Sequence, residues 1–365
     1  MITTESELKE LTERAVNAPC VALDTEFFWE RTFYPILGVV QVGFSESDCH
    51  LIDAVALPTL PHFGKMLTSR TTCKILHDAQ QDLAILSRIT NVTPCNIFDT
   101  RRAAGFTGLE STLSLANLLR KVLNVEIPKT ETRSNWLKRP LTQKQIAYAV
   151  NDVSFLPELR ELLISKADEL GNGSYLTEEM QLFDKDDYYR EPSPEDIFNR
   201  IKSGRLRGKS RNVMLELVRW REDVAHARNI PRGHVLKNSD LITLAHYMPQ
   251  NSNDIKNIRG LPRSASTHYS SRILAAVAKG CETTQTAGTP RRQRLTPAIQ
   301  QQIVNRIEAM QKKATAAGVD PALVAAKNAI TELVLSENTS QQLLFTENSE
   351  TAPHPLLSGW RKNFL

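Results

Sequence analysis

The chain has 365 residues, a length typical of two or three domains. Its composition, with 24% charged and 41% hydrophobic residues and a net charge of +4, is that of a folded globular protein and excludes a disordered or collagen-like chain. The sequence contains no run of 18 apolar residues and starts with a polar, acidic segment, so we expect neither a membrane span nor a secretory signal.

The first half of the chain alternates apolar strand patterns with helical periodicity. Strands are predicted at residues 20–27, 36–44, 50–52, 72–77 and 96–99. Helices are predicted at residues 6–15, 78–88, 113–123 and 142–170. Short links between the first three strands predict an antiparallel meander, and the later alternation with helices predicts parallel additions. Together they indicate an α/β fold with a five-stranded mixed sheet and flanking helices.

A charged segment with two prolines at residues 184–193 reads as a linker, and an all-helical pattern follows it. A Gly-, Thr- and Pro-rich segment at 280–294 predicts a second linker before another helical block. Residues 221–238 and 306–328 share a pattern of helix, proline turn, Lys-Asn and helix, which predicts two duplicated helical domains. The alternative is that such segments resemble each other by composition alone.

The two halves differ in charge. Residues 1–195 carry 20 basic and 28 acidic residues, whereas residues 196–365 carry 25 basic and 13 acidic residues. A basic half favours attraction to nucleic acid, although charge also varies between domains for solubility.

Two carboxylates lie two residues apart in the first strand. Because side chains alternate along a strand, Asp24 and Glu26 share one face, and Thr25 and Phe27 share the other. Buried carboxylates are costly unless a cation binds them, and oxygen ligands suit Mg²⁺ or Mn²⁺. The alternative is an exposed edge of the sheet.

Other candidates follow at helical spacing. Tyr148 and Asp152 lie four residues apart and therefore share a helix face, a pattern that an ordinary amphipathic surface also produces. Asp78 is expected at the N-cap or in the first turn of the following helix, whereas Asp82 lies one turn further among leucines and isoleucines and has a poorer explanation of this kind. His77 is expected to be structural, with metal ligation as the alternative.

These motifs, in this order, resemble the three exonuclease motifs of the DEDD superfamily. The segments are DTEF at 24–27, HDAQQDLAIL at 77–86 and YAVND at 148–152, and the tyrosine marks the DEDDy branch. The segments FYPILGVVQVG, IFDTRRAAGF and KTETRSNWLKRPLTQKQIAYAVNDV are similar to the ribonuclease D family. The helical blocks resemble the HRDC (helicase and RNase D C-terminal) domains of that family, the second one weakly.

The resemblance implies a ribonuclease H-like exonuclease domain at 1–190 and HRDC-like helical domains at 205–282 and 295–365. It also implies a 3′–5′ exoribonuclease that uses two divalent metal ions, Mg²⁺ or Mn²⁺, to release nucleoside 5′-monophosphates. By resemblance, Asp24 bridges both ions, Glu26 and Asp152 support the ion that activates water, and Asp82 supports the ion at the leaving oxygen. Tyr148 orients the water, because a phenol with a pKa near 10 is a poor base at neutral pH.

Nucleic-acid contacts are predicted next to these motifs. Phe28 and Trp29 follow the first motif and are candidates for stacking on terminal bases, whereas Phe27 is expected in the core. Basic candidates for phosphate contact in the segment before Tyr148 are Lys129, Arg133, Lys138 and Arg139. In the helical half, the expected contacts to an RNA backbone are Arg205, Arg207, Lys209, Arg211, Arg291, Arg292 and Arg294.

The expected substrate is RNA, above all tRNA precursors with 3′ extensions, and the expected assembly is a monomer. Five scattered cysteines without a C-x-x-C pair favour the cytoplasm over an oxidising compartment. Two alternatives remain: a 3′–5′ DNA exonuclease, and a non-catalytic RNA-tethering protein on a nuclease fold.

Overall fold

The computed structural model describes residues 1–128, 131, 134–202, 204, 206–284, 295–343 and 354–365. Contacts divide the chain into two compact units. The sheet unit comprises Met1–Phe28, Leu37–Tyr189 and Arg294–Leu365, and the helical unit comprises Trp29–Ile36 and Arg190–Gln293. The segment at 294–365 groups with the sheet unit and does not form a third unit. The three domains expected at 1–190, 205–282 and 295–365 remain a prediction.

The sheet unit is built on five strands in the order β3-β2-β1-β4-β5. Their bounds are β1 (Cys20–Phe28), β2 (Ile36–Ser45), β3 (Asp48–Asp53), β4 (Cys73–Leu76) and β5 (Ile97–Asp99). β1 pairs with β4 and β4 with β5 in parallel, whereas β2 and β3 are antiparallel. The predicted mixed five-stranded sheet is confirmed, and β1 lies at its centre.

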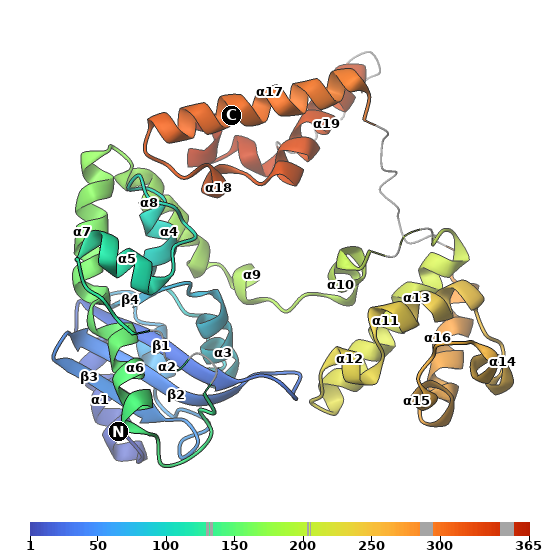
Figure 1. Ribbon diagram of the computed structural model, residues 1–365, viewed down its shortest axis with the longest axis horizontal. Coiled ribbons are helices and arrows are strands. Elements are labelled where there is room, and N and C mark those ends of the chain that lie inside the picture. Colours follow the sequence, from blue (N-terminus) through green and yellow to red (C-terminus); the bar gives the residue numbers. More distant parts are fainter. Residues whose placement is uncertain (129–130, 132–133, 203, 205, 285–294, 344–353) are drawn as a thin grey trace. The chain divides into compact units, whose positions relative to one another are not determined.

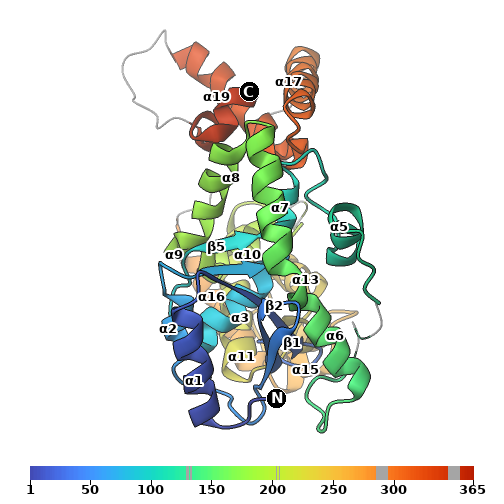
Figure 2. The same cartoon turned by 90° about the vertical axis from the view of Figure 1, so that its left-hand side faces the viewer.

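Helices cover both faces of this sheet. They are α1 (Glu5–Val16), α2 (Gly64–Leu67), α3 (Gln80–Thr90), α4 (Thr100–Ala104), α5 (Leu115–Val122), α6 (Gln143–Ser154), α7 (Leu156–Glu169), α8 (Gly173–Met180), η1 (Gln181–Asp184) and α9 (Asp186–Tyr189). Figures 1 and 2 show α6 and α7 along one face and α1 and α3 on the other.

The single helix predicted over 142–170 is wrong, because the structure has two helices there. α6 ends at Ser154, and Pro157 lies in the first turn of α7. Proline has no backbone N–H to donate and is tolerated in the first turn of a helix rather than in its interior. The break separates the helix that carries Tyr148 and Asp152 from the helix that packs along β4.

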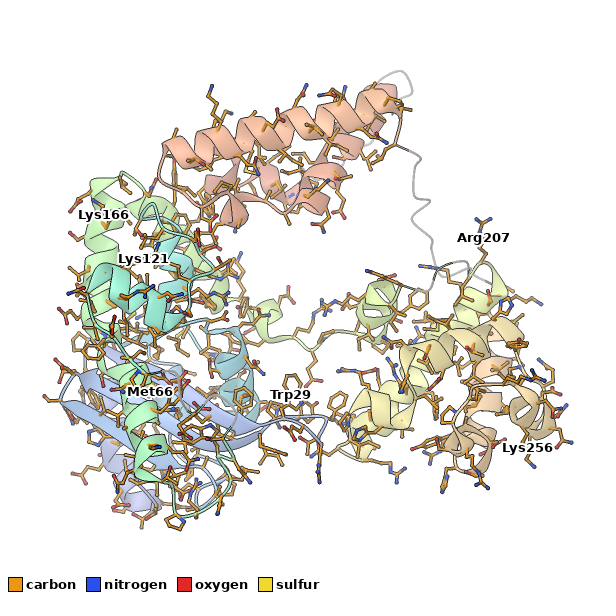
Figure 3. The ribbon with its side chains drawn as sticks, viewed as in Figure 1. Trp29, Met66, Lys121, Lys166, Arg207 and Lys256 are labelled. Carbon is orange, nitrogen blue, oxygen red and sulfur yellow. The ribbon has the colours of Figure 1, made fainter. Side chains whose placement is uncertain are left out.

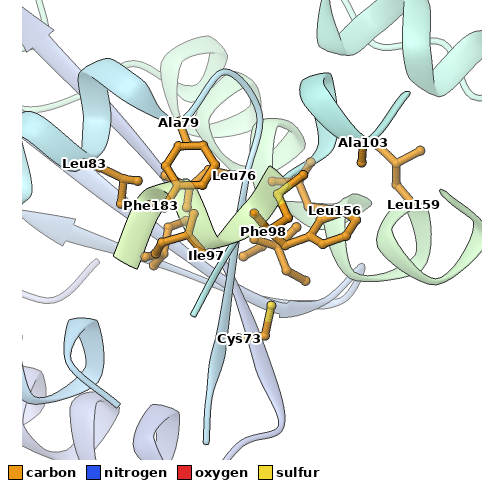
Figure 4. Packing of buried hydrophobic residues seen from close by; sticks show 14 of the residues in the cluster. Cys73, Leu76, Ala79, Leu83, Ile97, Phe98, Ala103, Leu156, Leu159 and Phe183 are labelled. Carbon is orange, nitrogen blue, oxygen red and sulfur yellow. The ribbon is translucent and has the colours of Figure 1, made fainter. Parts of the chain in front are cut away.

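Apolar strand residues form the core between these layers. Val21, Ala22 and Leu23 of β1 and Val40 and Val42 of β2 are fully buried. Figure 4 shows part of this core, where side chains of β4 and β5 meet those of α3, α7 and η1. Burial of this kind is the main stabilising term of a folded domain, and it fixes β1 at the centre of a rigid layer.

The C-terminal segment packs on the sheet unit through hydrogen bonds and aromatic contacts. Its elements are α17 (Pro297–Ala316), α18 (Pro321–Val324), α19 (Lys327–Leu343), η2 (Pro355–Leu357) and η3 (Trp360–Phe364). Asp320 accepts from the backbone N–H and the hydroxyl of Ser111 at 2.6 and 2.7 Å. The Asn172 side chain donates to the carbonyls of Phe106 and Ala317 at 3.0 and 2.8 Å. These bonds join segments that lie far apart in the sequence.

Glu179 is the buried acceptor of this junction. Its carboxylate pairs with Arg102 at 2.6 Å and with Arg361 at 2.8 Å, and it accepts from the Trp360 indole N–H at 3.1 Å. The Trp360 ring also stacks on Tyr175, with centroids 6.0 Å apart. One side chain therefore joins α4, α8 and η3.

Replacing Glu179 with alanine is expected to lower the free energy of unfolding by about 1.5–3 kcal/mol, because it removes the buried acceptor shared by two partly exposed guanidinium groups and the Trp360 indole N–H. Chemical denaturation followed by circular dichroism measures the change. Glu169→Ala is the control, since Glu169 pairs with Lys166 on the surface, where such pairs contribute about 1 kcal/mol or less. Equal losses for the two variants would contradict a special role of Glu179.

The helical unit consists of short helices around one long helix. They are α10 (Pro194–Arg200), α11 (Lys209–Ala227), α12 (Arg232–Val235), α13 (Asn238–Tyr247), α14 (Ser252–Asn257), α15 (Arg263–Thr267) and α16 (Ser270–Glu282). α11 and α16 lie so close that a Cβ at Gly280 would stand 2.5 Å from Val213 Cα. The backbone N–H groups of Phe33 and Tyr34 donate to Asn229 Oδ1 at 3.1 and 3.2 Å, so this unit holds the segment between β1 and β2.

Candidate active site

The first two carboxylates come from the central strand. Leu23 is fully buried, and Asp24 and Glu26 are partly buried on the same face of β1. Apolar neighbours bring the strand to the middle of the sheet, and the two-residue spacing then places both carboxylates on one side. The edge-strand alternative is wrong, because β1 has β2 and β4 on its two sides.

The third carboxylate comes from α6. The helix begins with a capping box, in which Gln145 N–H donates to the Thr142 hydroxyl at 3.2 Å and Thr142 N–H donates to Gln145 Oε1 at 3.0 Å. From this fixed start, Asp152 reaches the sheet. One ligand atom each from Asp24, Glu26 and Asp152 lies within 4.8 Å of the other two. Residues more than 120 positions apart thus form one acidic group.

Asp82 adds the fourth carboxylate from the first turn of α3. Its side chain is 8% exposed and accepts a hydrogen bond from the Thr25 hydroxyl. Its charge acts on Asp24, Glu26 and Asp152, raising the pKa of each. The structure therefore places all four predicted carboxylates together.

Burial raises the pKa of every carboxyl in this group, and the charges of neighbouring carboxylates raise it further. Burial is the largest cause in each case, followed by neighbouring carboxylates for Asp24 and Glu26. The pKa of Glu26 rises to about 8, and those of Asp82 and Asp152 rise to about 7. Hydrogen bonds from Thr25 to Asp82 and from Tyr148 to Asp152 act in the opposite direction. The ionised group is thus unstable without a counter-charge.

The donor set fits divalent cations. Within the part of the chain that the structure describes, no lysine or arginine pairs with these four carboxylates, so no side chain neutralises them. All their ligand atoms are oxygens, which Mg²⁺ and Mn²⁺ prefer, and there is no cysteine or histidine among them.

Tyr148 lies next to this group and stays protonated. Burial, and then the charges of Asp152, Glu26 and Asp24, raise its pKa above the ordinary value. Its phenol is thus a hydrogen-bond donor at any physiological pH. Behind it lies the buried ring of Trp136, with ring centroids 6.1 Å apart and planes tilted by 42°.

Trp136 was not singled out from the sequence, and neither was Gln41 of β2. Trp136 is positioned by Gly38, where any Cβ would stand 2.5 Å from the Trp136 carbonyl oxygen. Gln41 is fully buried and donates from Nε2 to Asp24 Oδ2 at 3.4 Å. The signal for Gln41 was present, because it is the one amide in an otherwise apolar strand pattern, ILGVVQVGF.

The residues predicted to stack on bases end the strand. Phe27 packs against the core as expected, Phe28 is partly buried, and Trp29 is 51% exposed. Trp29 donates from its indole N–H to the Phe33 carbonyl at 3.0 Å, which holds its ring in the segment after β1 (Figure 3).

The predicted phosphate contacts have different fates. Lys129 and Arg133 lie outside the described residues, and Lys138 is exposed. Arg139 is occupied within the fold: it pairs with Asp53 at 2.6 and 2.7 Å and donates to the carbonyls of Gly38 and Trp136, both at 2.8 Å. These contacts favour an anchoring role for Arg139 over phosphate binding.

In the helical half, Arg207 and Lys209 are exposed, but the prediction for Arg211 is wrong. Arg211 is 8% exposed, with its guanidinium 4.5 Å from the centre of the Phe198 ring, so it is a packing residue. The other predicted contacts, Arg205, Arg291, Arg292 and Arg294, lie outside the described residues.

Two neighbours of the second motif have structural roles. Both ring nitrogens of His77 are engaged, with the Thr100 hydroxyl at 3.0 Å and the Leu113 carbonyl at 3.1 Å, and burial lowers its pKa to about 4. Its structural role is confirmed. The prediction that Asp78 caps α3 or lies in its first turn is wrong: α3 begins at Gln80, its N-cap is Ala79, and Asp78 pairs with Arg101.

Comparisons with known proteins agree with this geometry. A family model described as 3′-5′ exonuclease matches residues 1–168, and one described as HRDC domain matches residues 210–277. The curated ribonuclease D of Desulfotalea psychrophila is 37% identical to the chain over 369 aligned residues, which cover 100% of this chain and 96% of the relative. The chain belongs to the ribonuclease D family. It is accordingly a 3′–5′ exoribonuclease, a hydrolase.

Solved structures of other proteins share the fold. Escherichia coli RNase D, described as an exoribonuclease involved in structured RNA processing, matches with a TM-score of 0.85 at 26% identity, covering 100% of this chain and 96% of that one. The catalytic core of RRP6 from Trypanosoma brucei, as the C496S mutant, matches with a TM-score of 0.58 at 18% identity, covering 77% of this chain and 80% of that one. This match shows likeness of fold alone. A family of DEDD-type exonucleases implies divalent metal ions, which agrees with the acidic group.

None of the helices in the described ranges is both long enough and apolar enough to cross a membrane.

Proposed function

We propose that this member of the ribonuclease D family is metal-dependent, and that Asp24, Glu26, Asp82 and Asp152 hold two divalent ions, Mg²⁺ or Mn²⁺. The observation that carries the proposal is the group of four buried or half-buried carboxylates with raised pKa values and no cationic partner among the described residues. Two such ions, when bound, lower the pKa of water and neutralise the attacking and leaving oxygens of a phosphodiester.

The remaining work falls to side chains of the chain itself. Tyr148 donates a hydrogen bond and orients the attacking water, since its raised pKa makes the phenolate inaccessible. Thr25 holds Asp82 in place by donating to its carboxylate. Hydrolysis at the terminal phosphodiester breaks the bond to the 3′ oxygen of the penultimate nucleotide and releases a nucleoside 5′-monophosphate.

The proposed substrates are structured RNAs with 3′ extensions, tRNA precursors above all. Support comes from the E. coli relative, which acts in structured RNA processing, and from the basic half of the chain. Phe28 and Trp29 stack on terminal bases, and exposed Lys138, Arg207 and Lys209 contact phosphates. The protein acts as a monomer in the cytoplasm, in keeping with five cysteines that are all free.

The test uses a 5′-labelled RNA with a free or a phosphate-blocked 3′ end, incubated with Mg²⁺ or Mn²⁺ or with EDTA. A ladder that shortens from the free 3′ end, and is absent with the block and with EDTA, is the expected result. The same oligonucleotide as DNA measures the preference for the sugar. Tight, salt-sensitive binding without shortening would contradict the proposal and favour a tethering protein.

A further inference from the structure

Gln41 stands out as a polar side chain in the apolar interior of β2. It is fully buried, like Val39, Val40 and Val42 around it. Its Nε2 donates to Asp24 Oδ2 at 3.4 Å, and its Oε1 is buried without a hydrogen-bond partner among the described residues.

The fold alone does not explain this amide. A buried acceptor that has lost its water and found no partner destabilises the folded state, and one long hydrogen bond compensates for it only in part. Leucine or methionine would fill nearly the same volume without that penalty. An unsatisfied buried group in a native protein requires an explanation. For Gln41, the contact of Nε2 with Asp24 offers one.

Among the described residues, no other side chain donates a hydrogen bond to the Asp24 carboxylate. The groups that act on Asp24 through their charge are the like-charged Asp82, Asp152 and Glu26. The amide N–H of Gln41 holds Asp24 Oδ2, and the backbone N–H of Thr25 also donates to this carboxylate. Because the amide is neutral, it orients the carboxylate without cancelling the charge that a cation needs, which a lysine or arginine at this position would do.

We propose that Gln41 is a positioning residue that holds the Asp24 carboxylate in the orientation that binds a divalent ion. The proposal rests on the proposed function, in which Asp24 is a metal ligand. Groups that hydrogen-bond to a metal ligand typically change metal affinity or activity by about 10- to 100-fold when they are replaced.

The test compares Gln41→Leu and Gln41→Met with the full-length wild-type protein. Isothermal titration with Mn²⁺ is expected to give a dissociation constant raised by about tenfold or more. In EDTA, the melting temperature of both variants is expected to equal or exceed that of the wild type, because the unsatisfied acceptor is gone. RNA hydrolysis is expected to fall most at low Mn²⁺ and to recover partly as Mn²⁺ is raised.

Asn172→Leu is the matched control, since Asn172 is also a buried amide but bonds to two backbone carbonyls far from the carboxylates. It is expected to lower the melting temperature and to leave the Mn²⁺ dissociation constant unchanged. An unchanged Mn²⁺ affinity in both Gln41 variants, or a lower melting temperature of both in EDTA, would overturn the positioning role.

Asp24→Asn in the same titration separates the two proposals. If Asp24→Asn loses Mn²⁺ binding while Gln41→Leu keeps it, the role of Gln41 fails and the metal site stands. If Asp24→Asn binds Mn²⁺ as the wild type does, the proposed function itself fails.

Discussion

Replacing Asp24 with asparagine is expected to lower the rate of 3′-nucleotide release at least about a thousandfold, while RNA binding changes little. Asp24 belongs to the acidic group, and under the proposed function its replacement removes a charge that would hold cations whose stabilisation of a transition state amounts to several kcal/mol. Single-turnover cleavage of 5′-labelled RNA measures the rate, and a filter-binding assay measures affinity.

Asp78→Asn is the matched control for this substitution. Asp78 precedes α3, is well exposed and pairs with Arg101 rather than with the acidic group. Its backbone has a φ of 63°, which asparagine tolerates as readily as aspartate does, so the change should be neutral for the fold. A cleavage rate reduced to the same extent in both variants would argue against a specific role of Asp24.

Without divalent ions, the protein is expected to become less stable as the pH rises from about 5 to 8. In the folded state the pKa values are about 8 for Glu26 and about 7 for Asp82 and Asp152, whereas in the unfolded chain they return to about 4. Between these values the folded state holds more protons than the unfolded state, so a rising pH favours unfolding. Differential scanning calorimetry in EDTA should show a melting temperature roughly 5–10 °C lower at pH 8 than at pH 5.

Mn²⁺ or Mg²⁺ should oppose this loss, because a cation binds the ionised carboxylates and is released as they become protonated. The rise in melting temperature on adding metal should therefore be larger at pH 8 than at pH 5. The variant Glu26→Gln/Asp152→Asn lacks two of the titrating groups and should show a weaker pH dependence in EDTA. If the variant keeps the full pH dependence, the carboxylates of the acidic group are not its source.

The parts of the site that periodicity governs were predictable. Asp24 and Glu26 on one strand face, and Tyr148 and Asp152 on one helix face, follow from spacings of two and four residues. Asp82 was predictable because it lies among apolar residues without a local role. The mixed sheet followed from the order of strand and helix patterns.

Contacts between distant segments were not predictable in this way. Strand alternation places Thr25 on the face of β1 opposite to that of Asp24. Nothing in the local sequence indicates that the Thr25 hydroxyl donates to Asp82. Arg139 and Arg211 look like surface cations in the sequence, since charge alone does not reveal a buried partner such as Asp53 or Phe198. The break between α6 and α7 was missed because the apolar periodicity continues through Pro157.

The hydrogen bond from Asn172 to Ala317 joins residues 145 positions apart. A ribosome adds about 5–20 residues per second, so roughly 7–30 s separate the synthesis of these two partners. Throughout that interval the residues beside α8 lack their contacts with the C-terminal segment. The whole helical unit is synthesised before that segment. Chaperones and proteases can therefore reach the residues beside α8 during this interval, although β1 and α6 have already been synthesised.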